Sequence, residues 1–301
     1  MLRLAMTTRA ETFDRVREPF ADRDIEVTHV QVKKRAIRLT DVDPADAALS
    51  ANFDVGFVYP GRLMEGAALD ARLDIPWVND REAVLSSRNK AGVIAALDAA
   101  GVAVPRTVMI SNPVGESVVV DAVSEFSFPV VVKPNSTTRG IGVAKAADLD
   151  SLLGLVDYLN LVHDFRATGD KSYLIQEYLP DARDYRAMVI DGDCVGAVER
   201  RLPDSLGEGR WKHNVHRGAT ATGVDLPDRH QRLAERTAAV LDIPYLGVDL
   251  LETDDRLVVN ETNARPTIDA ATKYEPDFYD RLAGLIHETA ERGRTSSKNG
   301  G

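Results

Sequence analysis

The stretch that most constrains the fold is Gly247–Pro266, which reads GVDLLETDDRLVVNETNARP. Two apolar runs flank a short polar segment, a pattern typical of two strands joined by a turn. Because side chains alternate between the faces of a strand, Glu261 and Asn263 share a face. A three-residue loop would bring Asp249 opposite Glu261 on that face, whereas a two-residue loop would put the two carboxylates on opposite faces. We therefore predict the longer loop or a bulge.

This hairpin would gather two carboxylates and one amide, all of them oxygen ligands. Such a set suits Mg²⁺, which takes one or two carboxylates and completes its shell with water and substrate phosphates. An acidic hairpin with solvated charges is the alternative. Apolar neighbours on both sides of Asp249 and Glu261 favour a partly buried site, because unpaired buried carboxylates are costly.

The composition excludes several classes of protein. The chain has 301 residues and 44% apolar residues, enough for about two globular domains. No segment approaches ~20 consecutive apolar residues, so we expect no membrane span, and the N-terminus does not resemble a secretory signal. The single Cys194 excludes an intramolecular disulfide and a cysteine-based zinc site. A net charge of −10 without a basic stripe argues against nucleic acid, and we expect a cytoplasmic location.

Residues 1–81 are predicted to form a small α/β lobe. Strands over 2–6, 26–30 and 54–58 alternate with helices over 10–21 and 63–73, a pattern that favours a parallel sheet. No Gly-rich fingerprint follows the first strand, so a dinucleotide-binding fold has no support.

The middle of the chain offers two lysines of different character. Lys90 lies in a helix expected over about 80–100, where a solvated surface charge is the default interpretation. Strands are predicted over 108–110, 117–120 and 128–134. Lys133 ends the last of them, just before a loop rich in Gly, Ser and Thr. A lysine in that position suits phosphate binding, although a plain loop is the alternative.

Positive charge gathers in one segment of this otherwise acidic chain, at Arg200, Arg201, Arg210, Lys212, His213, His216 and Arg217. The two histidines invite a metal interpretation, but the surrounding cations disfavour a dication and no third soft ligand lies near. A surface that binds a polyanion is the better explanation.

Several of these signals occur in an order that resembles the ATP-grasp superfamily, and within it the RimK-like glutamate ligases. The ordered set is Lys90, the FPVVVKP run with Lys133, Gln176-Glu177-Tyr178-Leu179, Asp184-Tyr185-Arg186, Glu199-Arg200-Arg201, the segment from Trp211 to Gly218, Gly247-Val248-Asp249, and Asn260-Glu261-Thr262-Asn263. The resemblance covers residues 75–290, with a looser match before them. Each motif alone is weak, whereas the ordered set is specific.

The resemblance implies an α+β fold: two α+β lobes that clasp ATP, preceded by an α/β lobe with a parallel sheet. The corresponding boundaries are 1–81 for the N-terminal lobe, 82–290 for the ATP-grasp domain with a lid lobe at about 107–178, and 291–301 for a disordered tail. Dimers or tetramers are common in the family, so a homo-oligomer is one option, but the sequence does not fix the oligomeric state.

The resemblance also implies roles for individual residues. Lys90 and Lys133 would bind ATP phosphates, Glu177-Tyr178 would hold adenine largely through the backbone, and Asp184 would meet the ribose. Lys212, His213 and Asn214 would line the nucleotide site. Asp249, Glu261 and Asn263 would hold Mg²⁺ or Mn²⁺. Arg217 and Arg200 would bind the acyl phosphate or the substrate carboxylate.

The implied activity is ligation of a carboxylate to an amine through an acyl phosphate. The amino acid would be glutamate or another one, and the acceptor a small molecule or a protein. The sequence departs from the family pattern at Arg265, where a small residue is usual, and in the bulky Thr137-Thr138-Arg139 segment of the lid loop. These departures motivate an alternative, an ATP-binding sensor or partner-binding protein that does not ligate.

Overall fold

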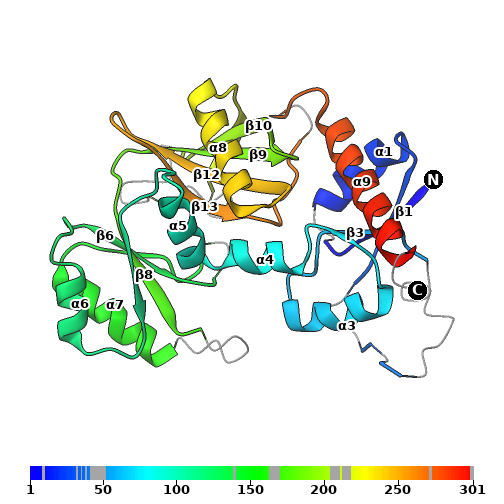
Figure 1. Ribbon diagram of the computed structural model, residues 1–301. Coiled ribbons are helices and arrows are strands. Elements are labelled where there is room, and N and C mark those ends of the chain that lie inside the picture. The colour runs from blue at the N-terminus through cyan, green and yellow to red at the C-terminus, as the bar shows by residue number, and fades with distance from the viewer. Residues whose placement is uncertain are drawn as a thin grey trace.

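The structure is a computed structural model that describes residues 1–8, 11–31, 33–34, 36–37, 39–40, 52–137, 140–162, 170–203, 211, 218–270 and 273–298. The described strands form three sheets, and helices pack on them (Figure 1). The N-terminal sheet and the lid sheet lie at opposite ends of the molecule, with the five-stranded sheet between them. Among the described helices, none is long and apolar enough to cross a membrane.

The N-terminal sheet is parallel throughout, in the order β2-β1-β3-β4. Its elements are β1 (Leu2–Met6), α1 (Glu11–Ala21), β2 (Ile25–His29), β3 (Val55–Phe57), α3 (Leu63–Leu73) and β4 (Trp77–Val78). The alternation of strands and helices along this segment therefore produces the predicted parallel sheet.

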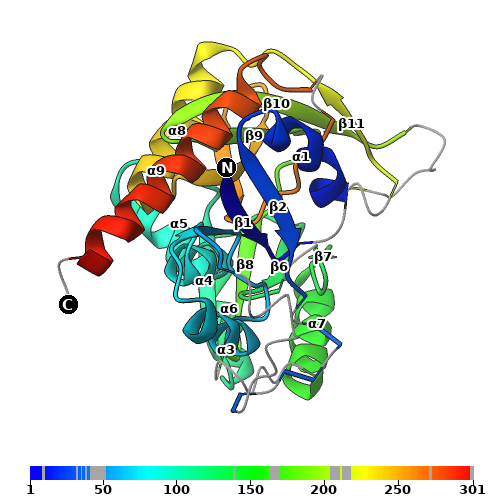
Figure 2. The same cartoon turned by 90° about the vertical axis from the view of Figure 1, so that its right-hand side faces the viewer.

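The last helix, α9 (Phe278–Lys298), packs on the N-terminal sheet (Figure 2). Its Leu282 belongs to the same buried apolar cluster as Leu4 of β1. The predicted boundaries group the first half of α9 with the 82–290 domain and begin the tail at residue 291. The helix instead continues to residue 298 and buries its apolar face against the opposite end of the sequence; residues 299–301 lie outside the described residues.

The lid sheet is antiparallel, in the order β5-β8-β6-β7. Its elements are β5 (Thr107–Ser111), α6 (Glu116–Ala122), β6 (Val130–Pro134), β7 (Ala144–Ala146), α7 (Leu149–Val162) and β8 (Ser172–Glu177). These elements lie within the range predicted for the lid lobe, whose independence as a domain stays a prediction.

The strand predicted over 117–120 is wrong, because this segment lies within helix α6. Its three consecutive valines favour a strand by propensity, but tertiary packing overrides that preference. Val119 and Val123 are buried in one cluster with Ile110 of β5 and Leu152 of α7, and Val118 faces solvent. A helix places this apolar pair on one side, four residues apart, over the sheet.

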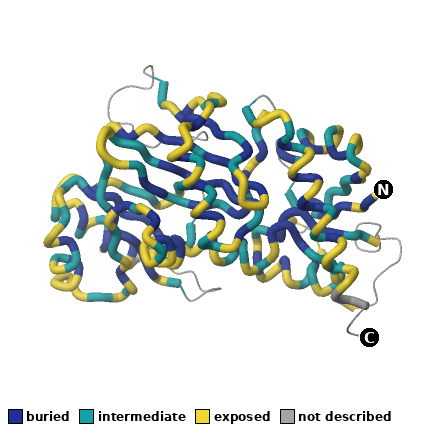
Figure 3. Tube along the Cα trace, turned by 45° about the horizontal axis from the view of Figure 1, so that its top comes forward, coloured by how far each residue is buried: buried dark blue, intermediate teal, exposed yellow. Residues whose placement is uncertain are grey.

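The five-stranded sheet is antiparallel, in the order β11-β10-β9-β12-β13. Its strands, and the helix α8 that covers it, are β9 (Arg183–Ile190), β10 (Asp193–Arg201), β11 (Thr220–Gly223), α8 (Asp228–Leu241), β12 (Tyr245–Glu252) and β13 (Leu257–Asn263). The central strands are buried over most of their length (Figure 3).

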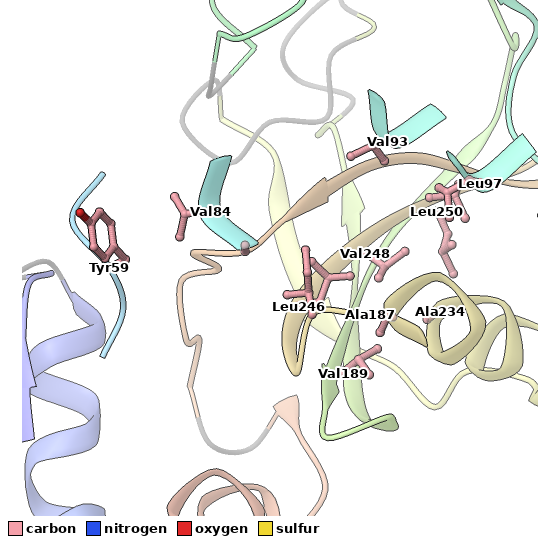
Figure 4. Packing of buried hydrophobic residues seen from close by; sticks show 14 of the residues in the cluster. Tyr59, Val84, Val93, Leu97, Ala187, Val189, Ala234, Leu246, Val248 and Leu250 are labelled. Atoms are coloured by element: carbon pink, nitrogen blue, oxygen red, sulfur yellow. The ribbon is translucent and has the colours of Figure 1, made fainter. Parts of the chain in front are cut away.

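One face of this sheet packs on helices. Figure 4 shows Ala187 of β9 and Val248 of β12 turned towards Ala234 of α8, and Leu250 beside Leu97 of α5 (Lys90–Ala99). The alternate residues of these strands therefore face the other side, where the polar residues described below lie.

The helix predicted over 80–100 is two helices, α4 (Arg81–Arg88) and α5, separated at Asn89. The side chain of Asn89 accepts a hydrogen bond from the backbone N–H of Gly92 at 3.1 Å, as an N-cap does. Asparagine prefers caps over helix interiors, which explains the break. The break makes Lys90 the first residue of a new helix.

We expect Leu97→Ala to lower the free energy of unfolding by about 3 kcal/mol, because the substitution leaves a cavity in the main core. Leu97 is 0% exposed, whereas Met64 on α3 is 68% exposed and is the control, with little change expected for Met64→Ala. Urea denaturation followed by circular dichroism measures both. Equal stability of the two variants would contradict the packing described here.

Candidate functional site

The β12–β13 hairpin sets the centre of the site. Its register pairs Glu252 with Leu257, which leaves a four-residue loop, and pairs Asp249 with Glu261 across the two strands. The register shifts by one residue between the Leu250–Val259 pair and the Asp249–Glu261 pair, so Asn260 is the extra residue of a β-bulge. The predicted pairing and the bulge are confirmed, whereas the three-residue loop is wrong.

The bulge decides which side chain opposes Asp249. With a four-residue loop and no bulge, Asp249 would pair with Asn260, and Glu261 would turn to the helix-covered face. The inserted residue restores Glu261 to the face of Asp249. Asn263, which pairs with Gly247, follows on the same face two residues later.

The carboxylate of Asp249 lies in a charge network with Arg186, Arg200 and Asp184, on three adjacent strands. Arg186 donates from Nε to Oδ1 at 2.7 Å and from Nη2 to Oδ2 at 2.8 Å. Arg200 Nη2 lies 3.0 Å from Oδ2 and also pairs with Asp184. Burial alone would raise the pKa of Asp249, but the two guanidinium groups lower it to about 2. Asp249 is therefore ionised at neutral pH.

The same network contains two residues that were expected to contact ligands, and those ligand contacts stay predictions. Asp184, expected at a ribose, is buried and accepts hydrogen bonds from Arg200. Arg200, expected at a substrate, is also buried, and the two neighbouring carboxylates raise its pKa although burial opposes this. Arg186 was given no role from the sequence. Its position two residues after Asp184 on a strand was the available signal, because such residues share a face.

Lys90 is buried rather than solvated, so the surface interpretation is wrong. Its Nζ donates to the backbone oxygens of Asn135 (3.3 Å) and Thr137 in the lid lobe, and lies 3.4 Å from Oε1 of Glu261. The side chain of Asn135 also accepts a hydrogen bond from the backbone N–H of Ala91 at 2.9 Å, which adds a second contact between α5 and the lid loop. Lys90 thus connects α5, the lid loop and the hairpin.

Lys133, at the end of β6, reaches the bulge from the lid lobe. Its Nζ donates to Oδ1 of Asn260 at 2.8 Å. Burial lowers the pKa of Lys133 to about 8, although the nearby Glu261 carboxylate opposes this. The two consecutive residues of the bulge therefore face two lysines, Asn260 towards Lys133 and Glu261 towards Lys90.

Glu177 joins the lid lobe to the hairpin turn. Its carboxylate accepts hydrogen bonds from Arg256 at 3.0 and 2.8 Å and from the backbone N–H of Arg106 at 2.8 Å. Burial would raise the pKa of Glu177, but these donors lower it. The side chain is thus occupied in holding the lobes together, and its backbone remains the part predicted to hold adenine.

Tyr178 contacts Trp211 and Lys145, and of these three residues the prediction gave a nucleotide-binding role only to Tyr178. Its ring meets the ring of Trp211 edge to face, with centroids 5.9 Å apart. The Nζ of Lys145, on β7, lies 4.5 Å from the Tyr178 centroid and 5.7 Å from that of Trp211. Lys145 had no motif signal in the sequence, because the contact is formed by the fold of the lid.

Four predicted site residues, Lys212, His213, Asn214 and Arg217, lie outside the described residues. The roles inferred for them from the resemblance stay predictions.

The donor set fits a hard divalent cation. Asp249 and Glu261 carry carboxylates on paired strands, and Asn263 carries an amide oxygen. This amide oxygen accepts a hydrogen bond from the backbone N–H of Arg265 at 2.9 Å. In the part of the chain that the structure describes, no cluster of three or more His, Cys, Asp or Glu side chains could hold a metal. Water and phosphate oxygens would have to complete the shell, as they do around Mg²⁺ in phosphate-binding sites.

Comparisons with known proteins identify the family and the fold. A family model described as the RimK-like ATP-grasp domain matches residues 87–278. A probable alpha-L-glutamate ligase of Citrobacter koseri is 30% identical over 198 residues, covering 65% of this chain and 62% of the relative. A ribosomal protein bS6–L-glutamate ligase of Escherichia fergusonii has the same identity and coverage. The chain thus spans less than two thirds of the length of these relatives.

Solved structures show the same fold. The RimK domain ATP-grasp protein of Sphaerobacter thermophilus superposes with a TM-score of 0.68 and 22% identity, over 95% of this chain and 98% of that one. A D-alanine–D-alanine ligase of Bacillus anthracis, solved with ATP, gives 0.69 and 18% identity over 99% and 100%. The predicted α+β ATP-grasp fold is confirmed.

We expect Arg200→Gln to lower the free energy of unfolding by about 3 kcal/mol, because Asp184 and Asp249 would keep their burial and lose a shared cation. The control is Arg232→Gln on α8. The Arg232 side chain is 69% exposed, against 8% for Arg200, and its partner Asp228 is also exposed, so the substitution should change stability little. Urea denaturation at neutral pH compares the two. Equal losses would show that the buried network does not stabilise the sheet.

Proposed function

The chain belongs to the RimK-like ATP-grasp family, and we propose that it is an ATP-dependent carboxylate–amine ligase. In this reaction an oxygen of a substrate carboxylate attacks the terminal phosphorus of ATP, ADP leaves, and an acyl phosphate forms. The amine of an amino acid then attacks the acyl carbon. Phosphate leaves with the electrons of the broken bond, and the amine gives up a proton as the amide forms.

The pairing of Asp249 with Glu261, opposite Lys90 and Lys133, carries the proposal. Phosphoryl transfer requires a protein mainly to position the reactants and to neutralise negative charge. The site provides both. The carboxylates of the hairpin are suited to binding a cation, and the buried lysines of α5 and β6 supply positive charge. A bound Mg²⁺ or Mn²⁺, held by Asp249, Glu261 and Asn263, would neutralise charge on the phosphates.

The contacts of the individual residues support distinct roles. Lys90 and Lys133 bind oxygen atoms at the junction of the lid loop and the bulge, and phosphate oxygens would replace those partners. Arg200 touches two buried carboxylates, which favours positioning of Asp249 over contact with substrate. Arg217 stays our candidate for binding the acyl phosphate.

Glutamate is our proposed amino acid, since the relatives are named alpha-L-glutamate ligase and ribosomal protein bS6–L-glutamate ligase. The acceptor would be a carboxylate on a small molecule or a protein terminus.

One observation favours the second candidate, an ATP-binding protein that does not ligate. The carboxylate of Asp249 is already bound by Arg186 and Arg200. If these ion pairs persist with nucleotide bound, Asp249 has less capacity to hold a metal, and turnover would be slow.

ADP release distinguishes the two functions. We expect Mg²⁺-ATP and glutamate to give ADP when an acceptor fraction from cell extract is added, and Glu261→Gln to abolish release because a carboxylate ligand is lost. Asp255→Asn, in the exposed hairpin turn, is the control and should retain activity. ATP binding by calorimetry without ADP release in any mixture would favour the non-ligating protein.

The pKa of Lys133 predicts a pH dependence of nucleotide binding. Its ammonium is present below pH 8 and lost above it, because burial lowers the pKa to about 8. Affinity for Mg²⁺-ATP should therefore fall about tenfold between pH 7 and pH 9, as the charged fraction falls by that factor. Calorimetry at both values measures it. Lys133→Gln should bind weakly at both, and a similar pH dependence in that variant would assign the effect to another group.

A further inference from the structure

A small pocket opens at the carboxyl edge of the N-terminal sheet. It is lined by residues that follow β1 and β2, by the segment between β3 and α3, and by the segment after β13; the polar lining residues and the glycine are Thr7, Gln31, Lys33, Gly61, Arg62 and Arg265. Loops at the carboxyl edge of a parallel sheet are a common place for ligands. The pocket has room for one small polar group rather than a whole substrate.

Arg265 enters the pocket from the hairpin. Its Nη2 lies 3.5 Å from Oγ1 of Thr7, 258 positions away in sequence. The guanidinium also lies against Gly61, where an added Cβ would be 2.0 Å from Nη1. A side chain at position 61 would therefore displace Arg265, so the glycine makes room for the guanidinium.

Arg88 adds a second guanidinium beside the same glycine. Its Nη2 donates to the backbone oxygen of Gly61 at 2.8 Å, and burial lowers its pKa. Within the described ranges no carboxylate forms an ion pair with Arg88. Arg62, by contrast, pairs with Glu65 at 2.8 Å. Among the described residues that line the pocket, Lys33, Arg62 and Arg265 are basic and none is acidic, in a strongly acidic chain.

Two arginines, Arg62 and Arg265, line this small polar pocket. Their guanidinium groups match the chemistry of a carboxylate or a phosphate, both of which accept paired hydrogen bonds from arginine. The N-terminus of α3, which no side chain caps, adds favourable dipole charge on the same side.

The pocket is close to the proposed reaction centre. Arg265 follows the proposed metal ligand Asn263 by two residues, so their Cα atoms are at most about 7 Å apart. A substrate of modest length can thus reach both places.

We propose that this pocket binds a second anionic group, a carboxylate or a phosphate, of the organic substrate, and that Arg265 determines specificity for it. The proposal rests on the ligase function above and adds the substrate class: a molecule whose reacting group and anionic group are separated by a few bonds. Because Arg265 would hold the substrate and take no part in bond making, its loss should raise KM more than it lowers kcat.

Binding of simple anions tests the pocket without any turnover. The protein is saturated with Mg²⁺ and a non-hydrolysable ATP analogue, so that the phosphate positions are filled, and titrated with inorganic phosphate and separately with succinate. We expect at least one anion to bind the wild type, and Arg265→Gln to weaken it about tenfold or more because a lining guanidinium is lost. Tighter phosphate binding indicates a phosphorylated substrate, and tighter succinate binding a dicarboxylate.

Two further variants sharpen the test. Gly61→Ala keeps every charge but displaces the guanidinium, and should also weaken anion binding. Arg281→Gln removes an equal charge from a half-exposed side chain of α9 that does not line the pocket, and this variant should bind as the wild type does. Retained affinity for the ATP analogue shows that each variant is folded. No anion binding to the wild type, or equal binding by Arg265→Gln, overturns the proposal even if ADP release proves the ligase function.

Discussion

One inserted residue in β13 determines the chemistry of this protein's central sheet. Strand side chains alternate strictly, so a register change of one residue exchanges the two faces. The bulge at Asn260 makes that change between the apolar end of the hairpin and its polar end. On the far side of the bulge Val259 packs in the core, and on the near side Glu261 faces Asp249. Because of the bulge, one part of β13 packs in the apolar core and the next part carries side chains of the charged site.

The charged side chains of the site are stable in their buried positions only because each is paired with an opposite charge. Asp249 is buried and ionised because Arg186 lies directly across from it on β9, and Arg200 is buried because two carboxylates surround it. Removing any member leaves a buried charge with less compensation, which costs more than the pair itself contributes. Lys90 and Lys133 are likewise buried with polar partners on the hairpin. Lys90 of α5 lies beside Glu261, and Lys133 of β6 donates to Asn260.

The sequence predicted those features that depend on local pattern. The parallel N-terminal sheet and the Asp249–Glu261 pairing follow from periodicity and spacing, whereas the ATP-grasp fold was expected from the resemblance of the ordered motifs to that family. The loop length was wrong because a four-residue loop with a bulge and a three-residue loop produce the same pairing. The burial of Lys90 depends on Asn89 ending one helix, and α6 depends on packing over the lid sheet. The contact of Arg265 with Thr7 joins segments that no local pattern relates.

The packing of α9 on the N-terminal sheet has a consequence for the order of folding during synthesis. Leu4 and Leu282 share one core, so the first strand emerges from the ribosome long before the helix that covers it. The lid and the five-stranded sheet can bury their cores earlier, from contiguous segments. The N-terminal lobe therefore keeps apolar surface exposed until α9 has been synthesised, and it is the part of the nascent chain most in need of protection by a chaperone.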